Sequence, residues 1–317
     1  MSVPALRIGT RASALALWQA QHVAALVAAQ QGAPPVELTR ISTSGDAQSE
    51  VPLWQVGGRA FFTREIDRAL LGGTVDLAVH SLKDVSTQLD AGLTLAATLS
   101  RADARDALVS RDGATLAALP PGARIGTSSL RRRAFLARLR PDAKLTELRG
   151  NVPTRIERLQ HGDYDAIVLA AAGLTRLGLA GHISEYLPPE SFPPAVSQGI
   201  VGVCARSGDA PTLRWLAALD DAQARLAASA ERALLRRLEG GCQVPLGALA
   251  TVRHGRLSLA ATVCALDGRR ALSAQGESAA GMAEALALGI RVAEELLALG
   301  AAELIALERG AHAVEEP

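Results

Sequence analysis

Arg7-Ile8-Gly9-Thr10 recurs as Arg124-Ile125-Gly126-Thr127, and this repeat decides the fold class. In each copy the tetrapeptide ends an apolar run typical of a strand and leads into an amphipathic helix. We expect these helices from Ser13 to about Ala29 and from Ser128 to about Leu139. The sequence therefore predicts two strand–helix units of one design.

The elements that follow keep the same order in both copies. A second strand, a second helix and a third strand are expected at 36–41, 63–66 and 75–79 in the first copy and at 143–148, 154–157 and 164–169 in the second. Short α/β segments can recur by chance, but an ordered series favours a duplication. Strands that alternate with helices predict two α/β lobes with mainly parallel sheets, whose ligands bind beyond the carboxyl ends of the strands.

Three domains are expected along the chain. The first lobe takes residues 1–100 and about 198–219, the second lobe takes 101–197, and the C-terminal domain takes 220–317. Because the strand at Ile200–Cys204 returns the chain to the first lobe, two crossings join the lobes and form a hinge.

The C-terminal domain is predicted from a change of pattern after Asp220-Asp221. The expected order is a helix to about Leu238, strands at 246–252 and 257–266, a turn at Asp267-Gly268, another short strand and a final helix from about Met282. This order is typical of an α+β domain with a small antiparallel sheet.

Charge and hydropathy narrow the function classes. The 33 Lys and Arg residues against 32 Asp and Glu give a net charge of +1, so no global field attracts nucleic acid or an anionic membrane. No apolar run reaches the roughly 20 residues of a membrane span, and Arg7 and Arg11 argue against a signal peptide. We expect a cytoplasmic monomer without a metal site, since the histidines show no metal-ligand spacing.

Arginines recur where a strand ends or a helix begins. A cation in the first turn of a helix is unfavourable by roughly 0.3 to 1 kcal/mol unless an anion compensates it. Any single arginine can equally be a solvated surface residue. As a set, and without a glycine-rich phosphate loop, they favour a small ligand with several carboxylates. These arginines are Arg11, Arg131, Arg132, Arg133, Arg149, Arg155 and Arg176.

One acid lies among these cations. Asp84 ends the run His80-Ser81-Leu82-Lys83-Asp84, which follows the apolar strand at 75–79. A carboxylate in a cationic cleft is suited to proton exchange and to stabilising a cation. The alternatives are a helix N-cap or a structural salt bridge with Lys83. His80 is expected to be structural.

The three cysteines are too few, and odd in number, for a disulfide framework, which suits a reducing compartment. Cys204 and Cys264 lie in apolar runs and are predicted to be buried core thiols. Cys242 follows Gly240-Gly241 in a predicted loop. It is a candidate nucleophile or attachment point, or simply an exposed thiol, because reactivity depends on thiolate formation.

With these residues assembled, the chain resembles the porphobilinogen deaminase family over nearly its whole length. The resemblance implies two periplasmic-binding-protein-like lobes and a third α+β domain, in agreement with the division above. The matching motifs are Ile8-Gly9-Thr10-Arg11 with Ser13, Val79-His80-Ser81-Leu82-Lys83-Asp84, Gly126-Thr127-Ser128-Ser129-Leu130-Arg131-Arg132, Leu148-Arg149-Gly150-Asn151 and Glu239-Gly240-Gly241-Cys242-Gln243-Val244-Pro245.

The resemblance also implies a transferase of tetrapyrrole and heme biosynthesis. Such an enzyme condenses four porphobilinogen molecules stepwise into hydroxymethylbilane and releases ammonia, on a dipyrromethane cofactor joined by a thioether to the residue matching Cys242. The acetate and propionate groups of each pyrrole account for the arginines. The residue matching Asp84 is expected to contact pyrrole N–H groups, to stabilise the cation left by deamination and to shuttle protons.

Roles for the other site residues follow from the same resemblance. Lys83 and Arg155 are counted both as catalytic and as cofactor ligands. Cofactor carboxylates are expected at Lys83, Thr127, Ser129, Arg131, Arg132 and Arg155. The residues expected to steer substrate are Arg11, Ser13, Arg149 and Arg176.

Several positions depart from the usual family pattern. Ser86 replaces a proline, Arg59 and Ala60 replace a lysine and a glycine, and Ser197 replaces a glycine before Gln198. None removes a charged catalytic group. Since loss of glycine restricts the backbone, we expect effects on loop closure, hinge mobility and turnover.

Two alternatives to an active enzyme stay open. A two-lobed anion-binding or regulatory protein would use the same cleft without catalysis, and a catalytically idle relative would assemble the cofactor but turn over poorly. The Gly240-Gly241-Cys242 loop discriminates against the binding protein, which needs no anchoring thiol.

Overall fold

The computed structural model describes residues 4–44, 63–238 and 244–306. By their contacts these residues form two compact units. The first unit contains the described residues up to 102 together with 199–225, and the second contains 103–198 and the described residues from 226 onward. The predicted boundaries of three domains stay a prediction.

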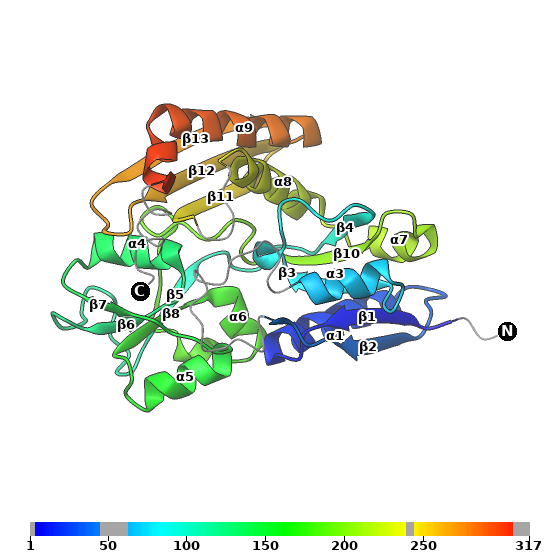
Figure 1. Cartoon of the computed structure of the whole chain (residues 1–317), viewed down its shortest axis with the longest axis horizontal. Coiled ribbons are helices and arrows are strands. Elements are labelled where there is room, and N and C mark those ends of the chain that lie inside the picture. The colour runs from blue at the N-terminus through cyan, green and yellow to red at the C-terminus, as the bar shows by residue number, and fades with distance from the viewer. Residues whose placement is uncertain (1–3, 45–62, 239–243, 307–317) are drawn as a thin grey trace. The chain divides into compact units, whose positions relative to one another are not determined.

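The first unit is built on a five-stranded sheet with the strand order β2-β1-β3-β10-β4 (Figure 1). The first three are parallel, and β10 runs antiparallel to both of its neighbours. Buried Ile8, Val23 and Val203 belong to its core. The strands are β1 (Leu6–Thr10), β2 (Val36–Arg40), β3 (Leu77–Ser81), β4 (Leu93–Thr98) and β10 (Val201–Arg206). The helices are α1 (Ala14–Ala28), α3 (Arg64–Leu71), the 3-10 helix η1 (Leu82–Asp84) and α7 (Ala210–Ala217).

The second lobe, within the second unit, has a five-stranded sheet with the order β7-β6-β8-β5-β9. Its first three strands are parallel, and β5 runs antiparallel to β8 and β9. The strands are β5 (Asp106–Ser110), β6 (Arg124–Gly126), β7 (Lys144–Thr146), β8 (Ala166–Ala170) and β9 (Glu185–Tyr186). The helices are α4 (Leu130–Leu139), α5 (Val152–Gln160), α6 (Ala171–Arg176) and the 3-10 helix η2 (Ala180–His182).

The two sheets have the same strand order and the same strand directions, with β1, β2 and β3 corresponding to β6, β7 and β8. The prediction of two similar α/β lobes is therefore confirmed. β10 also joins the first sheet as expected. The sequence did not predict β4, β5 or β9. Each sheet is mainly parallel, as predicted, with one reversed strand, β10 in the first sheet and β5 in the second.

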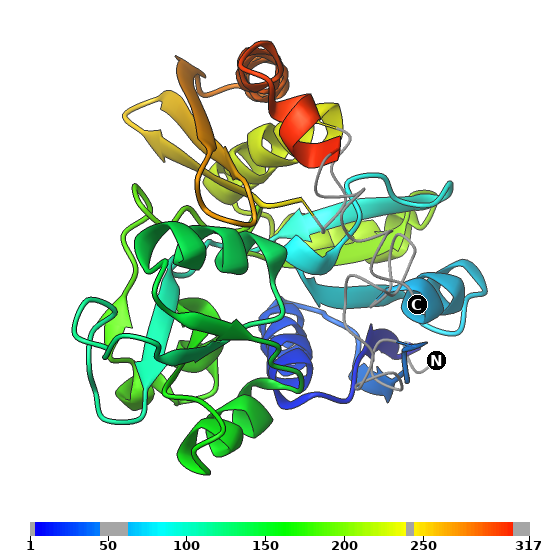
Figure 2. The ribbon, with the colours of Figure 1, turned by 60° about the vertical axis from the view of Figure 1, so that its left-hand side comes forward.

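The C-terminal domain has an antiparallel sheet of β11 (Leu246–Arg253), β12 (Arg256–Cys264) and β13 (Ala271–Ala279). Figure 2 shows α8 (Ala222–Arg237) and α9 (Met282–Ala298) on the same side of this sheet. Leu234 of α8, Leu259 of β12 and Val292 of α9 pack in the core between the sheet and these helices. The small antiparallel sheet is confirmed. The prediction that the third strand is short is wrong, since β13 has 9 residues.

The C-terminal sheet packs directly on the second lobe. The backbone N–H of Ala248 donates to the carbonyl oxygen of Pro194 at 2.9 Å. At Gly268, where φ is +74°, a Cβ would lie 2.3 Å from the backbone nitrogen of Arg138, so only glycine fits this turn against α4. Within the described ranges, no helix is long and apolar enough to cross a membrane.

Candidate functional site

Four predicted site residues gather at one edge of the first sheet. β1 and β3 are parallel neighbours, so their carboxyl ends open on the same edge. Arg11 and Ser13 follow β1, whereas Lys83 and Asp84 follow β3 within η1. The structure thus brings an acid, two cations and a hydroxyl together at the end of a sheet where ligands are expected.

Local hydrogen bonds fix this edge. Ser13 is the N-cap of α1, and its side chain accepts from the backbone N–H of Ala16 at 3.4 Å. The side-chain amide of Gln19 donates to the hydroxyl of Ser81 at 2.9 Å, which ties α1 to the end of β3. Asp84 is the last residue of η1 and not a helix N-cap, so that alternative for its role is wrong.

His80 lies beneath the same edge and is buried, with 6% of its surface exposed. Its Nε2 atom has no hydrogen-bond partner in the described part of the chain. Burial, with a further contribution from the positive charge of Arg11, lowers the pKa of His80 to about 4. The imidazole is therefore neutral near pH 7, which suits the structural role expected for it.

The second lobe presents a corresponding edge. Because β6, β7 and β8 are parallel neighbours, the residues that follow them lie along one end of the sheet. Thr127 and Ser129 follow β6, and Arg149 follows β7. Arg155 lies in the first turns of α5, as predicted. Arg176 follows β8, as expected, and is the last residue of α6, which begins directly after that strand.

Short polar contacts shape the loops of this second edge. Thr127 Oγ1 accepts from the backbone N–H of Ser129 at 3.2 Å, and Ser129 Oγ caps α4 by accepting from the N–H of Arg132 at 3.4 Å. The Nε atom of Arg155 donates to the carbonyl oxygen of Gly150 at 2.7 Å. These donors and turns hold the backbone where an anion would be bound.

Arg131 and Arg132 point into the lobe toward β5. Asp106, which is fully buried, accepts from Arg131 Nη2 at 2.7 Å and from Arg132 Nη2 at 2.7 Å. The second acceptors of the two guanidinium groups are the carbonyl oxygens of Pro193 and Val168. The expected contact of Arg131 and Arg132 with cofactor carboxylates stays a prediction. Since the pair has two positive charges and Asp106 has one negative charge, a net positive charge is left that would attract such a carboxylate.

Sequence reasoning missed Asp106 as the partner of this pair. Asp106 ends the charged run 101–106 at the start of the second lobe, which gives no sign of a buried side chain. The signal was the apolar run Ala107-Leu108-Val109 directly after it, which forms buried strand β5. An acid at the start of a buried strand requires a partner, because an unpaired buried carboxylate is strongly unfavourable.

Burial acts on several arginines of the second edge. It lowers the pKa of Arg176, of Arg149 and of Arg131, although Asp106 opposes this effect at Arg131 and Glu147 opposes it at Arg149. Partly desolvated guanidinium groups bind carboxylates more strongly than exposed ones, because the local dielectric is lower.

The cysteine predictions have separate outcomes. Cys204 and Cys264 are buried core residues, as predicted. Cys242 lies outside the described residues, as do Arg59 and Ala60. Ser197, where the family usually has glycine, adopts a φ of 63°, in the left-handed region that favours glycine.

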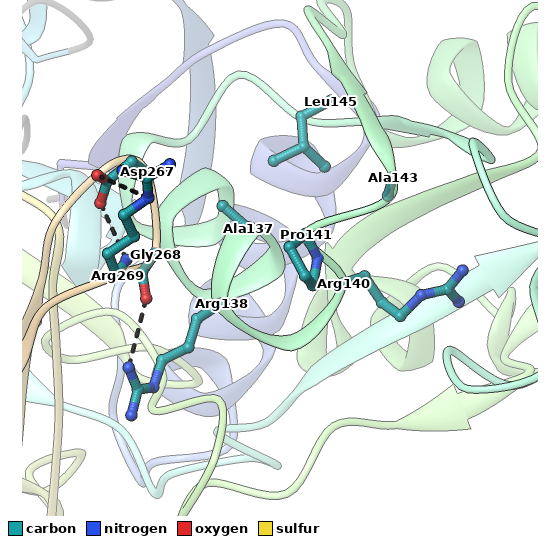
Figure 3. Close-up of a pocket in the computed structure, with 9 residues that line it drawn as sticks. All are labelled: Ala137, Arg138, Arg140, Pro141, Ala143, Leu145, Asp267, Gly268 and Arg269. Carbon is teal, nitrogen blue, oxygen red and sulfur yellow. Dashed lines mark hydrogen bonds and ion pairs between the residues drawn. The ribbon is translucent and has the colours of Figure 1, made fainter.

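A surface pocket of about 410 Å³ lies at the opposite end of α4 from Ser129 (Figure 3). Arg138 extends along it and donates to the carbonyl oxygen of Gly268 at 3.3 Å. Arg140 is bound to Asp142 at 2.7 Å. This pocket holds none of the predicted site residues, so we assign it no part in the site.

Comparison with known protein families decides the family of the chain. The family model described as "Porphobilinogen deaminase, dipyromethane cofactor binding domain" matches residues 6–214, and the model of the porphobilinogen deaminase C-terminal domain matches residues 225–298. The chain belongs to the porphobilinogen deaminase family. The family resemblance seen in the sequence motifs is thereby confirmed, with its transferase class and its dipyrromethane cofactor.

Individual relatives agree with this assignment. The chain is 50% identical to a porphobilinogen deaminase of Syntrophotalea carbinolica over 306 residues, 96% of each chain. It is 51% identical to that of Roseiflexus castenholzii over 301 residues, 95% of this chain and 98% of the relative.

Among solved structures, a nutrient binding protein from Burkholderia cenocepacia matches 67% of this chain and 89% of its own, with 15% identity and a TM-score of 0.42.

Proposed function

We propose that this chain condenses porphobilinogen units into hydroxymethylbilane with Asp84 as the residue that handles protons and positive charge. The observation that carries the proposal is the placement of Asp84 after β3, beside the parallel strand β1 that leads to Arg11 and Ser13. A catalytic acid and anion-binding groups on one rigid edge are what a substrate with an amine and two carboxylates requires.

The residues of the second edge fit a dipyrromethane. Its ring substituents are carboxylates, and the edge offers backbone N–H groups, the hydroxyls of Thr127 and Ser129, and the guanidinium of Arg155. When bound, the cofactor supplies the pyrrole carbon to which new units are added. We propose that Cys242 is its point of attachment and that Lys83, Arg131 and Arg132 complete the set that holds its carboxylates.

The role of Asp84 follows from charge. A carboxylate hydrogen-bonded to pyrrole N–H groups orients the rings, and its negative charge stabilises the cation left when ammonia departs. The terminal pyrrole carbon of a bound cofactor would have to give up a proton each time a unit is added to it, and Asp84 is the acceptor in this proposal. Neutral His80 beneath it adds no charge to the site.

The arginines have the complementary role of binding substrate carboxylates. Arg11 and Ser13 at the first edge, and Arg149 and Arg176 at the second, are proposed to orient the incoming porphobilinogen. Each charge-assisted hydrogen bond contributes about 1.5 to 3 kcal/mol, so several of them define one orientation of the ring.

The test is the substitution Asp84→Asn, which preserves the size of the side chain and removes its charge. We expect an intact fold by circular dichroism and a loss of turnover of at least about a hundredfold, the scale of general acid–base catalysis. Asp90→Asn, at an exposed position in the segment that follows, is the matched control and should keep its activity. Near-normal turnover in Asp84→Asn would exclude the proposed role.

We propose the remaining expectations from the sequence as well. A cytoplasmic location is supported by the three cysteines, which are too few, and odd in number, for a disulfide framework. A monomer is supported by the balanced charge of the chain. The division into two lobes, 1–100 with about 198–219 and 101–197, and a C-terminal domain, 220–317, is supported by one sheet in each part.

A further inference from the structure

Glu147 is an acid among the arginines of the second edge for which the proposed chemistry has no use. It lies between the end of β7 and Arg149. Its Oε1 atom is buried and has no hydrogen-bond partner in the described ranges. Such a carboxylate oxygen loses its hydration without gaining a donor, so its presence needs an explanation.

The loop that carries Glu147 is fixed at both ends. Tyr164 Oη donates to the backbone carbonyl oxygen of Glu147 at 2.6 Å, and Arg155 Nε donates to that of Gly150 at 2.7 Å. The ring of Tyr164 in turn packs on Gly126 so closely that a Cβ there would lie 2.8 Å from it. The backbone that carries the Glu147 side chain is therefore held in place next to Arg149 and Arg155.

Three arginines, one in the same loop and one each on α4 and α5, interact electrostatically with this carboxylate. Burial raises the pKa of Glu147, while Arg149, Arg133 and Arg155 lower it. Glu147 acts on Arg149 in return: its negative charge raises the pKa of Arg149, whereas burial lowers that pKa. Tyr164 is the other titratable group within range. The interaction is therefore one of charge, and not of a hydrogen bond to the buried oxygen.

We infer that Glu147 is a positioning residue that balances the charge of Arg133, Arg149 and Arg155 and thereby weakens their hold on ligand carboxylates. This inference rests on the proposed function, in which Arg149 and Arg155 bind the carboxylates of substrate and cofactor. A bound carboxylate must share these cations with Glu147 and is repelled by it. A moderate affinity suits a site in which each ring has to be released as the chain lengthens.

The experiment compares Glu147→Gln with the parent enzyme in steady-state kinetics with porphobilinogen. Glutamine keeps the shape and removes the charge, so KM should fall by about three- to tenfold, the effect of one charge at short range in a partly buried site. Because the effect is electrostatic, the difference in KM should shrink as the salt concentration rises. The turnover number should change less than KM.

Glu157→Gln is the matched control. Glu157 is exposed on α5, so its substitution removes the same charge from the same lobe and should leave KM within about twofold. Equal effects of the two substitutions would show that only the net charge of the lobe matters and would overturn the inference. An unchanged or raised KM in Glu147→Gln would overturn it as well.

A third variant separates the inference from the function on which it rests. Arg149→Gln should raise KM if Arg149 binds a substrate carboxylate. If Arg149→Gln raises KM and Glu147→Gln does not lower it, the inference about Glu147 fails while the proposed function stands. If Arg149→Gln leaves KM unchanged, Arg149 does not bind a substrate carboxylate, and the inference about Glu147, which rests on that role, falls with it.

Discussion

Asp106 and Arg132 form a buried pair in which one carboxylate oxygen accepts from two guanidinium nitrogens, at 2.7 Å from Nη2 and 3.1 Å from Nε. Arg131 binds the other oxygen. We predict that Asp106→Asn lowers the free energy of unfolding by about 3 to 5 kcal/mol, because it leaves two buried cations without a counter-charge. Urea denaturation measures this change.

The control for Asp106 is Asp103→Asn. Asp103 binds Arg105 at 2.6 Å, but both side chains are about one-third exposed or more. An exposed pair contributes only about 0 to 1 kcal/mol. Comparable losses of stability in the two variants would contradict the account of Asp106 as the buried counter-ion.

Ser197→Gly should stabilise the protein. The residue has a φ of 63°, is 1% exposed, and its hydroxyl has no hydrogen-bond partner among the described residues. Relief of the left-handed conformation outweighs the greater freedom of glycine in the unfolded chain, for a net gain of about 0.5 to 1 kcal/mol. The gain should appear as a higher midpoint in urea.

Exposed His254, with a φ of 49°, is the control position. His254→Gly should show the backbone gain without the removal of a buried hydroxyl, and therefore a smaller effect. A loss of stability in Ser197→Gly would mean that the hydroxyl is needed and that the backbone strain is negligible.

His80 should make stability fall in acid. Its pKa is about 4 in the folded protein and 6.5 without the protein environment. Above about pH 6.5 the imidazole is neutral in both states and has no effect. Between pH 6.5 and 4 only the unfolded chain binds the proton, so the free energy of unfolding falls by about 1.4 kcal/mol per pH unit, on the order of 3 kcal/mol in all.

His80→Asn should remove this part of the pH dependence. The measurement is urea denaturation at several pH values between 4 and 7, with exposed His182→Asn as the control. If the slope of stability against pH is the same in His80→Asn as in the parent, the histidine is not the group that titrates.

Most of the fold was predictable because its signals are local. The Arg-Ile-Gly-Thr repeat and the apolar runs at β1, β3, β6 and β8 specify strands whose helices follow within a few residues. The strands β4, β5 and β9 escaped prediction because each gains its order from a partner far along the chain. β5, for example, pairs with β8 through Leu108 and Val168.

The site was predictable in its residue types and less so in its contacts. Motifs placed Arg11, Asp84 and Arg149 after strands, and the parallel pairing brought them to sheet edges. The direction of the Arg131 and Arg132 side chains toward Asp106 was not predictable, because it depends on the position of the reversed strand β5 within the sheet. Glu147 was overlooked because its significance comes in part from arginines on two other elements, Arg133 on α4 and Arg155 on α5.

The covalent attachment of a dipyrromethane to Cys242 is the central claim, and intact-protein mass spectrometry tests it most directly. The account predicts that the purified chain carries a covalent adduct of two pyrrole units and that Cys242→Ser has the mass of the unmodified polypeptide. An unmodified parent chain that is inactive toward porphobilinogen, or a Cys242→Ser variant that retains the adduct, would contradict it.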